Sequence, residues 1–240
     1  MSQRLYETRA RLVKVEAGQL PVTRITINDR AATREAIIHA VRRAGVEFVP
    51  RSDWAAHKSR NGNMVDDWNY QQVAIHHAGR SFSCGPAALQ LQQIQEMQMG
   101  KSRAAADDIA YHYAIDCFGT VYEGRDIRFK GEHVHNFNTG VIGVMLLENL
   151  TTAEEGKDFV AMARTVLSAM GLAHPPAIPA MQAESVETLV RVLQQFFEIK
   201  KLGGHREFPR QLGEGKICPG NIGLVFVKTL RNKLGLSLPG

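Results

Sequence analysis

The sequence predicts an α/β fold in which one mixed β-sheet is covered by helices. Apolar runs of strand length alternate along the chain with amphipathic helical segments, which is typical of that class. Residues 141–147 form a nearly continuous apolar run, as expected of a central strand buried on both faces. The 240 residues, 44% hydrophobic and 22% charged, have the composition of an ordinary globular protein. This length suits one large domain or a domain with an extension.

Residues 1–47 are predicted to be a small N-terminal extension of unknown role, and residues 48–240 the main domain. Residues 22–27 alternate β-branched side chains and predict a strand. Asn28 and Asp29 can cap a helix over about 31–44. The pair fits a small αβ appendage or a part of the main fold, and the sequence leaves both open.

In the main domain, 72–76 is a strand that ends in a polar pair, and 86–100 has the apolar spacing of a helix. Residues 118–120 predict a hairpin turn between two strands. Ser185 is the expected cap of a strongly amphipathic helix with apolar residues at i, i+3, i+4 and i+7. The remaining predicted elements are strands 109–116 and 121–123, a helix over 153–170, a proline-containing loop over 173–180, and a last helix over 224–234.

The three cysteines are Cys84, Cys117 and Cys218, an odd and sparse count that argues against a disulfide framework. If Cys218 binds a metal, Cys84 and Cys117 could pair, although two unpaired thiols are the simpler expectation. The formal charge of +5 favours an anionic partner. No run of five or more Lys and Arg residues is present, so we expect no nucleic-acid partner.

No apolar run approaches the ~20 residues that cross a bilayer, so no membrane span is expected. Basic residues near the N-terminus are not followed by the apolar segment of a standard signal peptide. We therefore expect a protein made in the cytoplasm, which either stays there or leaves by a non-standard route.

His76, His205 and Cys218 are the candidate metal ligands. Two imidazoles and a thiolate suit Zn²⁺, and three protein ligands leave the fourth position open, as in catalytic sites. A buried, hydrogen-bonded strand histidine is the simpler interpretation of His76 taken alone. His77 is the alternative ligand, and because neighbouring strand residues point to opposite faces, both cannot readily bind one ion. The triplet predicts a zinc hydrolase.

Several motifs in a fixed order resemble the type 2 N-acetylmuramoyl-L-alanine amidase family, which includes peptidoglycan recognition proteins and phage lysozyme-like amidases. The resemblance runs from about 49 to 236. It rests on 48–56, 73–78, 94–99, 108–113, 116, 119–125, 131–133, 138, 142–144, 204–206 and 218–220. It implies a central mixed sheet with flanking helices, a zinc site in a surface groove, and cleavage of the amide between N-acetylmuramic acid and L-alanine of peptidoglycan.

The resemblance also selects His76 over His77 as the ligand and suggests two catalytic residues. Tyr111 matches the tyrosine that positions or deprotonates the reacting water, and Lys216 would stabilise the oxyanion. An aromatic in an amphipathic strand and a solvated lysine are the simpler interpretations of these two. The predicted substrate-binding residues are His133, Asn138, His77 and Arg206.

Two differences from one branch of the family narrow the expected function. The cytoplasmic recycling branch has a glutamate where this chain has Met145, and an aspartate as the third ligand where it has Cys218. We therefore expect a bacterial or phage wall-lytic enzyme, such as a lysin or an antibacterial effector, acting on the wall or periplasm after export, injection or lysis. Peptidoglycan is the expected partner, with an immunity or delivery protein for an effector. The alternative is a non-catalytic peptidoglycan-binding recognition protein, although such relatives typically lose the third ligand.

Overall fold

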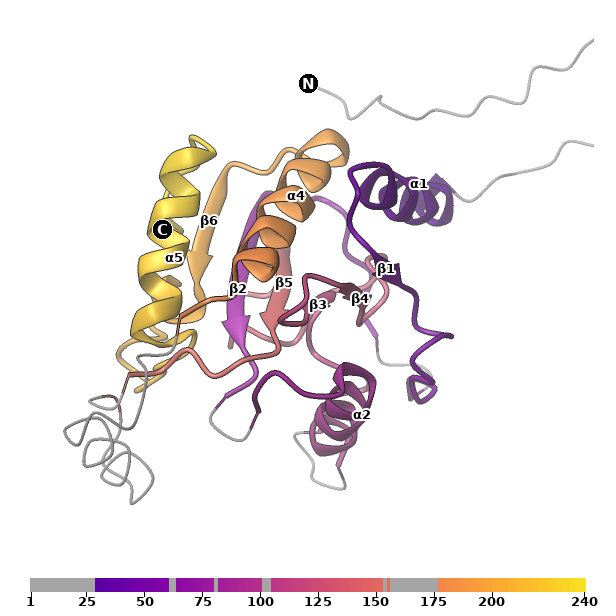
Figure 1. The fold of residues 1–240 in the computed structure, drawn as a ribbon, viewed down its shortest axis with the longest axis horizontal. Helices are drawn as coiled ribbons and strands as arrows, with labels where there is room; N and C mark the ends of the chain where they lie inside the picture. Colours follow the sequence, from indigo (N-terminus) through magenta and orange to yellow (C-terminus); the bar gives the residue numbers. More distant parts are fainter. Residues whose placement is uncertain (1–28, 61–63, 80–81, 101–104, 153–154, 156–176) are drawn as a thin grey trace, which may run out of the picture.

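Six strands form one mixed sheet in the computed structural model, which describes residues 29–60, 64–79, 82–100, 105–152, 155 and 177–240 (Figure 1). The strand order is β1-β4-β3-β5-β2-β6. The strands are β1 (Phe48–Val49), β2 (Gln72–His77), β3 (Tyr113–Ile115), β4 (Val121–Glu123), β5 (Val141–Leu146) and β6 (Lys201–Gly204). Only β3 and β4 pair antiparallel, and every other neighbouring pair is parallel. The predicted mixed sheet is confirmed.

Helices cover both faces of this sheet. The main core joins one face to α1 (Asp29–Arg43), α4 (Ala180–Phe196) and α5 (Gly220–Lys233). Figure 1 shows α4 crossing in front of β2 and β5, between α1 and α5. A second cluster joins the opposite face to α2 (Ala87–Gln98) and to the buried Trp54.

The alternation of side chains along β2 determines which of its residues meet which layer. Val73 and Ile75 point into the main core under α4, whereas Ala74 packs in a separate cluster with Phe208 on the other face. Because successive strand residues point to opposite faces, His76 follows Ala74 to this second side. The His76 side chain therefore points away from the main core under α4, toward the loops on the other face of the sheet.

The helix of the N-terminal extension shares the core of the main domain. Ile37 and Val41 of α1 are fully buried in the main cluster. Arg34 on the same helix forms a two-pronged ion pair with Glu123 at the end of β4. Of the two possibilities that the sequence left open, the helix is therefore part of the main fold, while the expected strand over 22–27 lies outside the described residues.

Some element boundaries differ from the sequence prediction. The strand expected over 109–116 begins only at Tyr113, because the carbonyl of Ile109 accepts a hydrogen bond from the Arg125 side chain instead of a neighbouring strand. The helix expected to begin at Ser185 begins at Ala180, and the last helix begins at Gly220 instead of 224. Strands β1 and β6 were not predicted. The helix expected over 153–170 falls almost entirely outside the described residues.

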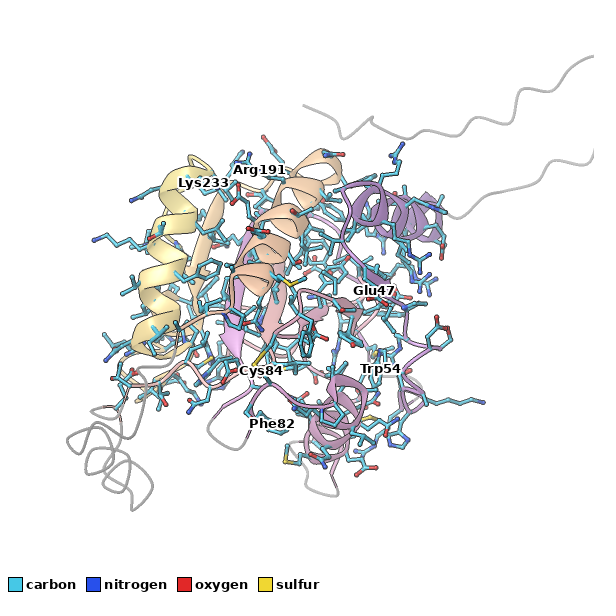
Figure 2. The ribbon with its side chains drawn as sticks, viewed as in Figure 1. Glu47, Trp54, Phe82, Cys84, Arg191 and Lys233 are labelled. Carbon is cyan, nitrogen blue, oxygen red and sulfur yellow. A yellow bond between two sulfur atoms is a disulfide. The ribbon has the colours of Figure 1, made fainter. Side chains whose placement is uncertain are left out.

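A disulfide joins Cys84 and Cys117, so the expectation of two unpaired thiols is wrong. Cys84 lies between β2 and α2, where Figure 2 labels it, and Cys117 follows β3. The sheet brings together the ends of β2 and β3, which flank β5, and so places the two cysteines side by side. Spacing along the chain could not reveal this, because the pair depends on strand order.

Within the part of the chain that the structure describes, no helix combines the length and the apolar character needed to cross a bilayer.

Candidate metal centre

Strand pairing brings the predicted metal ligands together. β2 and β6 are parallel neighbours with Ile75 opposite Gly204, so His76 and His205 emerge side by side where the two strands end. Cys218 joins them from the segment before α5, which is held to this edge by a hydrogen bond of 2.9 Å from the Arg206 N–H to the Cys218 carbonyl. One possible ligand atom from each residue lies within 4.8 Å of the others.

A chain of hydrogen bonds orients the ring of His76. Its Nε2 lies 3.1 Å from Nδ1 of His133, and Nε2 of His133 lies 3.3 Å from the Val141 carbonyl oxygen. A carbonyl only accepts, so His133 donates from Nε2 and its Nδ1 must accept. His76 therefore donates from Nε2 and keeps an unprotonated Nδ1, which faces the Cys218 sulfur at 3.6 Å.

These atoms fit a zinc ion. Tetrahedral coordination with bonds of about 2.3 Å to sulfur and about 2.1 Å to nitrogen would hold the two donors about 3.6 Å apart. That value matches the separation of the Cys218 sulfur and the His76 Nδ1 atom. A hydrogen bond from the second ring nitrogen to a protein acceptor is the usual support of a metal-binding histidine.

Burial keeps the imidazoles neutral, as metal ligation requires. Desolvation is the main cause that lowers the pKa of His76 and of His205. The neighbouring imidazoles add to it at His76, whereas at His205 the Gln211 hydrogen bond opposes it and the Lys216 charge adds to it. Burial also raises the pKa of the Cys218 thiol to about 12, against a smaller opposite effect of the His77 backbone N–H. The thiol therefore needs a bound cation to ionise at neutral pH, which a zinc ion would supply.

His133 fits its position because two glycines lie beneath its ring. A Cβ added to Gly131 or to Gly143 would overlap the His133 imidazole. Gly143 interrupts the apolar run of β5 at this point. The side chain of His133 is buried, and Asn138 holds its backbone by accepting hydrogen bonds from the His133 and Val134 N–H groups at 2.8 and 2.7 Å.

Tyr111 lies against the rings of His76 and His133. Its ring is 4.9 Å from the His76 ring and stacks on His133 at 6.0 Å, measured between centroids. Burial is the main cause that raises its pKa, and the nearby Cys218 adds to it. The phenol therefore stays protonated at neutral pH and can donate a hydrogen bond, so of the two roles expected for it, deprotonating water is the less favoured.

A cleft of about 660 Å³ opens over this centre. Tyr111, His133, Asn138, His205 and Lys216 are among the residues that line it. Lys216 is exposed, and its positive charge reaches His205, where it contributes to the lowered pKa. Four other predicted functional side chains thus share one cavity with the candidate metal ligand His205.

The other two expected substrate-binding side chains are engaged elsewhere. His77 is buried, and its Nδ1 accepts a hydrogen bond of 3.2 Å from the Leu150 N–H. Arg206 forms an ion pair of 2.6 Å with Glu155, whose other oxygen accepts the Asn221 N–H at the start of α5. Neither residue lines the cleft. Both contacts support the segment that carries Cys218 rather than the cavity wall.

One residue of the site escaped prediction from the sequence. Gln211 lies between His205 and Cys218 and contacts the His205 ring at 3.1 Å. A single glutamine in a polar loop carries no motif, so no signal in the sequence could have identified it.

Comparisons with known proteins show which family this chain resembles. Residues 66–221 match the family described as N-acetylmuramoyl-L-alanine amidase, and the matched region contains all three candidate ligands. The peptidoglycan-recognition protein SC2 of Drosophila melanogaster is 31% identical over 125 residues, which are 52% of this chain and 67% of that protein. Peptidoglycan recognition protein 1 of Mus musculus is 33% identical over 107 residues, or 42% of this chain and 56% of that protein.

Solved structures show the same fold. The Drosophila peptidoglycan recognition protein SD superimposes with a TM-score of 0.59 at 22% identity, covering 81% of this chain and 98% of that one. An endolysin N-acetylmuramoyl-L-alanine amidase from Clostridium intestinale gives a TM-score of 0.56 at 19% identity, covering 80% and 97%. At these identities the likeness shows the fold alone.

Proposed function

The chain belongs to the N-acetylmuramoyl-L-alanine amidase family, and from that premise we propose that it is a zinc-dependent hydrolase of peptidoglycan. Its reaction is cleavage of the amide between N-acetylmuramic acid and the L-alanine of the stem peptide. The convergence of His76, His205 and Cys218 beneath an open cleft is the observation that carries the proposal. Three protein donors leave a fourth position for the reacting groups.

His76, His205 and Cys218 would hold the ion. When bound, zinc supplies a Lewis acid that polarises the scissile carbonyl and activates water at neutral pH. The protein's own groups then orient the substrate and complement the charge that develops in the transition state.

Tyr111 and Lys216 have different tasks in this scheme. The Tyr111 phenol, kept protonated by burial, donates a hydrogen bond to the carbonyl oxygen as negative charge grows on it. The Lys216 ammonium adds positive charge at the rim of the same cleft. Asn138 keeps His133 in place, and both residues line the cleft in which the stem peptide would bind.

A second candidate function is binding of peptidoglycan without turnover. The names of the curated relatives, which are recognition proteins, favour it. The complete donor triplet and the adjacent protonated phenol favour catalysis instead, because binding alone has no need of a metal with an open position.

Digestion of purified peptidoglycan, followed by mass spectrometry of the products, separates these functions. We expect free L-alanine amino termini and intact glycan strands, and we expect a chelator or Cys218→Ala to prevent the release of those amino termini. Binding by the zinc-loaded protein without new amino termini would favour the recognition protein. New reducing sugar ends would contradict amide cleavage altogether.

We also propose that the protein acts outside the cytoplasm, as a wall-lytic lysin or an antibacterial effector with an immunity or delivery partner. The Cys84–Cys117 disulfide supports this, because such bonds persist in oxidising compartments. Expression in a Gram-negative host with and without an added periplasmic signal tests it. We expect lysis only with the signal, and only when Cys218 is intact; lysis from the cytoplasm would contradict the proposal.

A further inference from the structure

Gln211 is fully buried in a segment that is otherwise open to solvent. Its exposed fraction is 0%, whereas each residue from 212 to 217 is exposed. A polar side chain is costly to bury unless hydrogen bonds satisfy it. Two of the three hydrogen bonds of this side chain are made with residues of the candidate metal centre and its cleft, His205 and His135.

The hydrogen bonds determine which way the Gln211 amide faces. Its Nε2 donates to the carbonyl oxygens of His135 at 2.9 Å and of Pro209 at 3.2 Å. Carbonyls only accept, so the amide nitrogen must occupy this position, and Oε1 must face the His205 ring. The distance from Oε1 to Nε2 of His205 is 3.1 Å.

This orientation determines the tautomer of His205. An amide oxygen only accepts, so Nε2 of His205 carries the proton and Nδ1 keeps the lone pair. His76 is in the same state through its contact with His133. Both candidate imidazole ligands thus present Nδ1 to the metal, each with a different supporting residue.

The backbone of Gln211 reaches a second part of the site. Its carbonyl oxygen accepts hydrogen bonds from the N–H groups of Glu214 at 3.2 Å and of Lys216 at 3.1 Å. The same residue therefore orients the His205 ring with its side chain and determines where the Lys216 backbone lies. Through Nε2 it also holds the loop of His135, another residue that lines the cleft.

We propose that Gln211 is a positioning residue of this centre: it holds His205 in the metal-binding tautomer and links that ligand to Lys216 and to the His135 loop that lines the cleft. The inference deepens the proposed function and rests on it, since it assumes that the triplet binds zinc. Loss of an outer partner of a metal-binding histidine typically weakens metal affinity 10–100-fold.

Three full-length variants test this. Gln211→Met keeps the volume and removes the hydrogen bonds. Gln211→Glu, buried as a neutral carboxyl group, keeps an acceptor for His205 and a donor for the carbonyls. Gln182→Met is the matched control, because Gln182 is also fully buried and donates to a backbone carbonyl, that of Ile115 at 2.9 Å, but lies on α4.

Zinc affinity is measured by competition with a chromophoric chelator, the ligand field by the absorption of the Co²⁺-substituted protein, and folding by melting of the zinc-free protein. We expect Gln211→Met to bind zinc roughly 10–100-fold more weakly with an altered Co²⁺ spectrum. We expect Gln211→Glu and Gln182→Met to remain within about threefold of the wild type, well below that loss.

Zinc affinity of Gln211→Met within threefold of the wild type would overturn the inference. A loss of about tenfold or more in Gln211→Glu would also overturn it, and this outcome decides the matter even if the methionine variant melts before it can be titrated. A wild-type protein that binds neither Zn²⁺ nor Co²⁺ would instead contradict the proposed function, so the two failures are distinguishable.

Discussion

Nε2 of His76 donates a hydrogen bond of 3.1 Å to Nδ1 of His133, and this contact leaves the other ring nitrogen of His76 facing the Cys218 sulfur. The two histidines are 57 positions apart in the chain. Their pairing assigns His133 a role in orienting a ligand, in addition to its place in the wall of the cleft.

Replacing His133 by phenylalanine keeps an aromatic ring and removes the acceptor of the His76 proton. We expect zinc affinity to fall about 10–100-fold, as measured by chelator competition. His39→Phe, at an exposed site on α1, is the control and should bind zinc as the wild type does. Unchanged affinity in His133→Phe would show that His76 needs no such support.

Tyr111→Phe removes one hydroxyl group beside the proposed metal. We expect turnover on peptidoglycan to fall about 10²–10³-fold, the usual loss when one donor to a developing oxyanion is removed. The zinc content, measured by atomic absorption, should match that of the wild type. A variant with full turnover would exclude the phenol from the reaction, and a variant without zinc would assign it a structural role.

Lys216→Ala should also lower turnover, and the loss should depend on salt. The ammonium lies at an exposed rim, where charge effects are screened by ions. We expect the ratio of wild-type to variant turnover to shrink between low and high ionic strength, with Lys216→Arg retaining more activity. A ratio that stays constant over that range would rule out an electrostatic role.

The buried His112 should make the zinc-free protein sensitive to acid. Burial lowers its pKa to about 4, against 6.5 for an ordinary histidine. The unfolded state therefore binds the proton more tightly than the folded state does. The stability contributed by the buried, neutral His112 side chain is complete above pH 6.5 and is lost as the pH falls toward 4. The loss is about 3 kcal/mol in the free energy of unfolding.

Urea unfolding of the zinc-free protein at several pH values measures this loss. His112→Gln should be less stable at neutral pH and should show a shallower decline between pH 6.5 and pH 4. His39→Gln is the control and should decline as the wild type does. Equal slopes in His112→Gln and in the wild type would assign the acid sensitivity to other groups.

The disulfide should contribute substantially to stability. Cys84 and Cys117 close a loop of 33 positions, and the loop-entropy relation gives a stabilisation of about 3–4 kcal/mol. We expect reductant to lower the urea midpoint by the corresponding amount in the wild type and to leave Cys84→Ser unchanged. A wild-type midpoint that is insensitive to reductant would mean that the bond does not form.

Much of this fold could be predicted from side-chain periodicity. Burial on one or both faces imposes a recognisable pattern of apolar residues on an element. The sequence therefore reveals the apolar runs of β2 and β5 and the apolar stripe of α4. β6 was missed because its four residues end in two glycines, and only pairing with β2 makes them a strand. The start of α4 was misplaced because Ser185 is a good cap in isolation, whereas the helix begins directly after Pro179.

The ligand triplet could be predicted because its residues lie in motifs of recognisable type and order. Their supporting residues could not. The contact of Gln211 with His205 depends on how an irregular loop folds back, and the Cys84–Cys117 bond depends on the order of β2, β5 and β3 in the sheet. Neither relationship has a local pattern, since each is created by tertiary contacts.

The parallel register of β2 and β6 has a consequence for how the protein matures. His76 lies on the inner strand β2, whereas His205 follows the edge strand β6, which is made more than a hundred residues later. A nascent chain on the ribosome therefore has no complete site until β6 and Cys218 have been synthesised. An ion that binds only when β6 is paired with β2 would then stabilise that pairing against local opening. The stabilisation would grow with the metal concentration.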